Sequence, residues 1–193
     1  AEHQALSAAG VDEDEDLFSP VVRAFRRRVV WLAINLGTAF LASSVVGQFQ
    51  GTIDQLVALA VLMPIVAGMG GNAGTQVLAL MVRGLALGQV GASNANALVW
   101  KEARVALMNG LLIGGTVGLA TWLWFGDWQL ALVIFAALVI NLLSAAIAGV
   151  LVPLTLKRMR MDPALAGGVI LTTVTDVMGF FSFLGLATLV LLR

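Results

Sequence analysis

The sequence predicts an all-α membrane protein with five transmembrane helices. Of its 193 residues, 60% are hydrophobic and 11% are charged, and the mean hydropathy is +0.96. Soluble domains carry roughly 45–50% apolar and about 25% charged residues, because they need polar surface to face water. Disordered chains are also excluded, since they are poor in apolar residues and rich in net charge. Composition therefore indicates a chain whose surroundings are mostly lipid.

Five apolar stretches are each long enough to cross the hydrocarbon core of a bilayer, which takes about 20 residues of helix. We expect the helices at about 20–49, 53–82, 98–125, 130–156 and 163–192. The first should begin at Ser19-Pro20, since serine is a favourable N-cap and proline a favourable first helical residue. Residues 1–19 are then a polar segment outside the membrane, and 20–193 form the five-helix membrane domain.

Lysine and arginine predict the orientation of these helices, because basic residues gather on the cytoplasmic side of a membrane. With the N-terminus in the cytoplasm, only Arg193 lies on the far side. The cytoplasmic side then holds Arg23, Arg26, Arg27, Arg28, Arg83, Lys101, Arg104, Lys157, Arg158 and Arg160. We therefore expect a multi-pass protein of the plasma membrane with a cytoplasmic N-terminus and an external C-terminus.

Asp176 is the one acidic residue predicted to lie deep in the hydrocarbon, near the middle of the fifth span. A carboxylate there costs at least about 2.5–3.5 kcal/mol, and intramembrane charges are functional by default. A protonated or hydrogen-bonded packing role is the alternative interpretation. The neighbours favour function, because Thr172, Asp176 and Gly179 share one helix face and Thr175 adds a further hydroxyl.

A second cluster of helix-weakening and polar residues lies in the second span. It consists of Pro64, Gly68, Gly70, Gly71, Asn72, Gly74 and Gln76. Proline and glycine weaken a helix, and irregular backbone at membrane depth survives only where it is buried or lines a watery cavity. Close packing through Gly70-x-x-x-Gly74 explains the glycines but not Asn72 and Gln76. Packing and pore lining both stay open here.

Other polar residues have plainer interpretations. Asn35 and Asn141 are predicted to make interhelical hydrogen bonds, and His3 to be solvated. The acidic run Asp12–Asp16 is a solvated linker or a cation-sensing segment. Asp162 precedes a proline and is either a helix N-cap or a cation ligand at the cytoplasmic mouth. Glycines spaced for close helix packing occur at Gly110, Gly114 and Gly118.

Two motifs resemble the MgtE family of magnesium channels: Pro64-x-x-x-Gly68-x-Gly70-Gly71-Asn72-x-Gly74-x-Gln76, and Thr175-Asp176-x-x-Gly179-Phe180 in the fifth span. The resemblance covers about residues 20–193. It implies a homodimer with a pore on the dimer axis, lined mainly by the second and fifth helices, where Asp176 of each subunit holds the central Mg²⁺. It also implies cytosolic N-terminal and CBS domains joined to the pore by a plug helix, whose end residues 1–19 would form.

The expected function is a Mg²⁺-selective channel for uptake, gated by cytosolic Mg²⁺, with the transported ion kept hydrated. Its expected lining is Gly71, Asn72, Gly74, Gln76, Thr172, Thr175 and Gly179. A Na⁺- or H⁺-coupled exchanger of divalent cations is the alternative, because a broken helix with a midplane acid also describes transporters. An intramembrane aspartyl protease is disfavoured, since it needs two carboxylates per site. Neither enzyme activity nor a nucleic-acid partner is expected.

Overall fold

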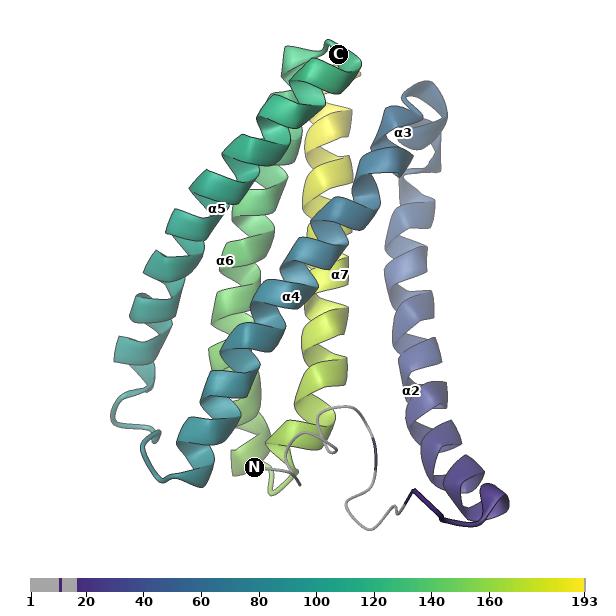
Figure 1. The fold of residues 1–193 in the computed structure, drawn as a ribbon. Helices are drawn as coiled ribbons and strands as arrows, with labels where there is room; N and C mark the ends of the chain where they lie inside the picture. The colour runs from purple at the N-terminus through teal and green to yellow at the C-terminus, as the bar shows by residue number, and fades with distance from the viewer. Residues whose placement is uncertain (1–10, 12–16, 193) are drawn as a thin grey trace.

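The computed structural model describes residues 11 and 17–192, and the regular secondary structure of these residues is entirely helical (Figure 1). The helices are α2 (Val21–Gln48), α3 (Gln50–Gln55), α4 (Ala58–Ala86), α5 (Ala95–Phe125), α6 (Trp128–Arg158) and α7 (Pro163–Leu191). All except α3 are long and apolar enough to cross a membrane. The predicted all-α fold with five spans is confirmed. His3 and the run Asp12–Asp16 lie outside the described residues.

The second apolar stretch differs from its predicted form. Instead of one helix from residue 53, the chain forms the short helix α3, leaves helical geometry at Leu56 (φ −138°, ψ 85°) and enters α4 at Ala58. A hydrogen bond of 2.8 Å between the hydroxyls of Thr52 and Thr188 ties α3 to α7. Helix α2 also begins one residue late, with Pro20 in the cap position and no side-chain cap.

Two aspartates cap the N-termini of helices. The Asp127 Oδ1 accepts hydrogen bonds from the backbone N–H groups of Gln129 (2.9 Å) and Leu130 (3.2 Å) at the start of α6. The Asp162 Oδ1 accepts from Ala164 N (2.9 Å) at the start of α7. Each satisfies backbone donors that have no partner within the first helical turn. The N-cap interpretation of Asp162 is confirmed.

Helix α6 is the centre of the bundle, because α4, α5 and α7 all pack against it (Figure 1). Helix α5 meets it along the predicted glycine row. A Cβ on Gly110 would lie 3.2 Å from Val139 Cα, and one on Gly118 would lie 3.2 Å from Ala131 O. These are backbone contacts, so the close approach depends on the missing side chains. The packing interpretation of this row is confirmed.

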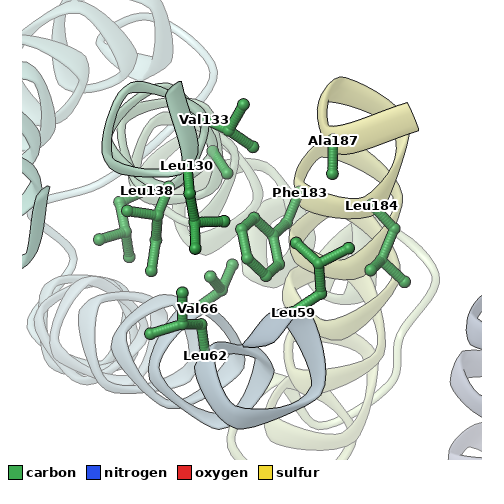
Figure 2. Close-up of a cluster of buried hydrophobic side chains, with 11 residues drawn as sticks. Leu59, Leu62, Val66, Leu130, Val133, Leu138, Phe183, Leu184 and Ala187 are labelled. Atoms are coloured by element: carbon green, nitrogen blue, oxygen red, sulfur yellow. The ribbon is translucent and has the colours of Figure 1, made fainter. Parts of the chain in front are cut away.

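The buried core lies where α4, α6 and α7 meet (Figure 2). The ring of Phe183 is fully buried between side chains of α4 and α6. Residues shown around it are Leu59, Leu62, Val66, Leu130, Val133, Leu138, Leu184 and Ala187. This core fixes α7, which carries Asp176, against the glycine-rich helix α4.

Helix α2 stands apart from this three-helix core (Figure 1). It packs chiefly on α7, and Ala42 is the only buried residue along its fully described length. Its exposed side chains are mostly apolar, so in a bilayer lipid tails can cover them without an energetic penalty.

Candidate functional site

Asp176 lies in the middle of α7, as the fourteenth of 29 helical residues. At about 1.5 Å per residue it is about 20 Å from the start of the helix, close to the centre of a roughly 30 Å hydrocarbon core. Its side chain is half-buried and has no hydrogen-bond or ion-pair partner among the described residues. A carboxylate at this depth is costly unless a partner compensates its charge, and the described part of the chain supplies no such partner.

The polar run around Asp176 divides between two sides of α7. Thr172 is exposed and lies one turn before Asp176, so these two share the outward face. Thr175 is fully buried, and its hydroxyl donates to Thr172 O at 3.0 Å. Gly179 is also buried, where α7 meets α4 and α6. Within one chain, Thr175 and Gly179 therefore face the core rather than the side on which Thr172 lies.

The glycines of α4 serve close packing. A Cβ on Gly70 would collide with the side-chain amide of Asn141, and one on Gly74 would lie 2.9 Å from Leu171 Cδ2. The helix continues unbroken through Pro64 and the glycines that follow it. The predicted weakening of the helix thus does not interrupt it, because these small residues let neighbouring helices support the backbone closely.

The other predicted residues of α4 point in different directions. Gly68 and Asn72 are exposed, and Gly71 is half-buried. Gln76 lines a cavity between α4, α5 and α6. Residues two apart in the sequence of an α-helix point in directions about 200° apart around its axis. Gln76 therefore lies on the side of α4 opposite to Gly74. Gly74 meets α7, and Gln76 faces α5.

That cavity of about 170 Å³ contains a charged pair that sequence reasoning missed. Glu102 is buried, and its Oε1 forms a 2.8 Å ion pair with Lys101 Nζ. Gln76 and Asn109 add two amides to the lining. The sequence places Glu102 near the inner end of α5, but it does not show that a cleft between α4 and α5 would enclose its side chain.

Asn141 forms the interhelical hydrogen bond that its type predicts. It is fully buried in α6, and its Nδ2 donates to Val66 O in α4 at 3.0 Å. Asp162 is exposed at the start of α7, with Oδ1 occupied by its cap. Among the described residues, no group of three or more His, Cys, Asp or Glu side chains lies close enough together to hold a metal ion. A cation site at Asp176 would therefore need groups from another copy, backbone oxygens or water.

Sequence comparison identifies the family. Residues 63–186 match the profile of the MgtE family, described as a divalent cation transporter. The chain belongs to the MgtE family. This match covers α4 to α7, including both motifs that carried the resemblance, and it identifies a family of transporters rather than enzymes. Together with the five apolar helices, it confirms the predicted multi-pass location in the plasma membrane.

Three curated relatives are named magnesium transporter MgtE. The protein from Bacillus subtilis (strain 168) is 30% identical over 187 residues, which are 97% of this chain and 41% of that protein. The Enterococcus faecalis protein is 30% identical over 181 residues, 94% of this chain and 40% of its own length. The Thermus thermophilus protein is 33% identical over 168 residues, which are 85% of this chain and 36% of that protein. The MgtE-family chain thus spans about two fifths of these relatives.

Proposed function

We propose that this chain is the ion-conducting membrane domain of a Mg²⁺ channel, in which two copies place their Asp176 side chains across a shared axis. The names of the three relatives indicate magnesium as the transported ion. The observation that carries the proposal is the half-buried carboxylate of Asp176, which lies at mid-membrane depth without a partner among the described residues. A second carboxylate and a divalent cation supply what one chain lacks.

Two facing carboxylates suit Mg²⁺ as the substrate. Mg²⁺ demands octahedral oxygen geometry and gives up its water reluctantly, so a pore for it must accept the hydrated ion. Two Asp176 side chains provide two negative charges, of which a monovalent ion would neutralise only one. Thr172 and Asn72 are exposed polar groups that contribute hydrogen bonds to the hydration shell, and Gly71 gives water access to the backbone. The buried residues of the set pack α4 and α7 within the subunit and do not face the ion; they are Gly74, Thr175 and Gly179.

A channel of this kind needs no further source of energy. Moving a charge of two through 100 mV is worth roughly 4.6 kcal/mol, which drives uptake into a negative cytoplasm. The distribution of basic residues supports a cytoplasmic N-terminus for the chain in this proposal. A Na⁺- or H⁺-coupled exchanger is the competing mechanism, and it differs in that flux must follow the second ion.

Gating by cytosolic Mg²⁺ would act at the inner end of α7. Asp162 is exposed there and uses Oδ1 for its cap, so Oδ2 is available to a cation. The relatives extend well beyond the length that this chain covers. We propose that cytosolic regions of the CBS type, joined through residues 1–19, complete such a site and close the pore when Mg²⁺ is abundant.

Flux measurements on Asp176→Asn test the proposal. The full-length protein is reconstituted in liposomes and Mg²⁺ entry is followed with a trapped indicator. We expect Asp176→Asn to abolish uptake, whereas Asp54→Asn, which neutralises an exposed carboxylate in α3, leaves it unchanged. Uptake by Asp176→Asn at the wild-type rate would refute the assigned role. In planar bilayers, a reversal potential that follows the Mg²⁺ gradient and ignores Na⁺ and pH gradients separates a channel from an exchanger.

A further inference from the structure

Asn141 lies at a point where α4, α6 and α7 meet. It is 0% exposed, and its Nδ2 bonds to Val66 O in α4. The same amide fills the space left by two glycines: a Cβ on Gly70 would collide with it, and a Cβ on Gly179 would lie 2.7 Å from Nδ2. One side chain of α6 therefore determines how closely both α4 and α7 approach at this level.

The amide is not optimised for stability. Its Oδ1 is buried and has no hydrogen-bond partner among the described residues. A buried acceptor without a partner destabilises a fold, whereas a leucine has the same branched shape and needs no partner. Val66 O belongs to a continuous helix and would keep its helical hydrogen bond without Asn141. Stability alone thus favours an apolar residue at this position.

The location of Asn141 relative to Asp176 supplies a reason for a polar residue. Gly179, which touches the amide, is three residues beyond Asp176 and therefore on the next turn of α7. A directional hydrogen bond to Val66 fixes the rotation and height of α6 against α4, and the amide then fixes α7. A packed leucine has no such directional preference.

We infer that Asn141 is a positioning residue, which sets the location of Asp176 relative to α4 and thereby the spacing of the carboxylates that receive hydrated Mg²⁺. This inference rests on the proposed function. Asn141 does not contact the ion. It acts through the Gly70 and Gly179 contacts, where a Cβ would press against its amide.

Concentration dependence of Mg²⁺ uptake tests the inference, because a structural defect and a positioning defect change different parameters. The full-length protein with Asn141→Leu should fold and retain its thermal stability, yet require about two- to tenfold more Mg²⁺ for half-maximal uptake, as expected for losing one hydrogen bond. Loss of folded protein would lower only the maximal rate. The matched control is Thr121→Val, which also removes a buried polar group but bonds only within α5. A wild-type half-saturating concentration in folded Asn141→Leu would overturn the inference.

A second pair of variants decides the question even if Asn141→Leu does not fold. Gly179→Ala places a methyl group against the amide and should raise the half-saturating Mg²⁺ concentration. Asn141→Ala/Gly179→Ala removes the clash with the amide and leaves a 3.3 Å approach of that methyl to Val66 Cγ1. It still lacks the bond to Val66 O, so we expect the concentration to stay raised. Full restoration in the double variant would show that packing alone matters and would overturn the inference. Uptake by Asp176→Asn is measured in parallel. If Asp176→Asn abolishes uptake while Asn141→Leu keeps the wild-type half-saturating Mg²⁺ concentration, the proposed function stands and the inference about Asn141 fails.

Discussion

Replacing Gly114 by valine should separate α5 from α6, since α5 contributes no side chain where the two helices meet. A Cβ on Gly114 would lie 3.2 Å from Cδ2 and 3.3 Å from the backbone oxygen of Phe135. Favourable contacts between carbon atoms begin at about 3.5 Å, and the two methyl groups of valine would come closer still. The Phe135 carbonyl is part of α6 and cannot move independently, so α5 must shift as a whole.

The neighbouring glycine provides the matched control for this change. Gly115 has no atom within 4 Å of its ideal Cβ position, so valine fits there. Both substitutions exchange glycine for the same β-branched residue in one helix, and their effects on helix propensity therefore cancel. The difference between them isolates the packing conflict. Overpacking of this kind typically costs about 1–3 kcal/mol, and we expect Gly114→Val to be less stable than Gly115→Val by that amount.

Unfolding in mixed micelles, with increasing amounts of a denaturing detergent, measures the difference through tryptophan fluorescence. Trp122 and Trp128 line the groove between the ends of α5 and α6, so their emission reports on the separation of these helices. Equal unfolding free energies for the two variants, within about 0.5 kcal/mol, would refute the claim that the glycine row sets the distance between α5 and α6.

Two further predictions concern single side-chain groups. Asp162→Ala should destabilise α7 by about 0.5–2 kcal/mol because the N-cap is lost, whereas Asp162→Asn keeps the cap. If Asp162 also binds regulatory Mg²⁺, Asp162→Asn should weaken inhibition of uptake by cytosolic Mg²⁺ at unchanged thermal stability. Unchanged inhibition would count against a regulatory site at Asp162. Thr188→Val should cost about 1–3 kcal/mol because it leaves the buried Thr52 hydroxyl without its partner, whereas Thr52→Val should cost less because the Thr188 hydroxyl still donates to Leu184 O at 2.8 Å. The double variant should recover part of the Thr188→Val loss, as a double-mutant cycle in micelles can show. Strictly additive losses would mean that the 2.8 Å contact contributes nothing.

The features predicted correctly from the sequence are those that the bilayer or the local backbone imposes. The thickness of the hydrocarbon core requires about 20 apolar residues per span, and this requirement alone identifies α2, α4, α5, α6 and α7. The Asp162 cap follows from an aspartate before a proline at the start of a helix. The bond of Asn141 to a neighbouring helix follows from the cost of an unpaired amide in an apolar interior.

The features that the sequence does not predict depend on which helices become neighbours. Asp54 and Gln55 are polar residues at one end of an apolar stretch, which does not show that the backbone leaves helical geometry at Leu56 between α3 and α4. Helical periodicity puts Gln76 and Gly74 on opposite sides of α4, but it does not say that one side meets α5 and the other α7. For the same reason Glu102 is recognisable as polar, while its enclosure beside Lys101 is not.

Exposure to lipid has opposite consequences for the apolar surface of α2 and for the carboxylate of Asp176. Nearly all of α2 is uncovered, but its side chains are mostly apolar and lipid satisfies them, so its isolation does not by itself demand a second subunit. Asp176 is only half-exposed, yet lipid cannot satisfy a carboxylate at mid-membrane depth. The carboxylate, rather than the larger apolar surface, is therefore the feature that supports the proposed pairing of two copies around a cation.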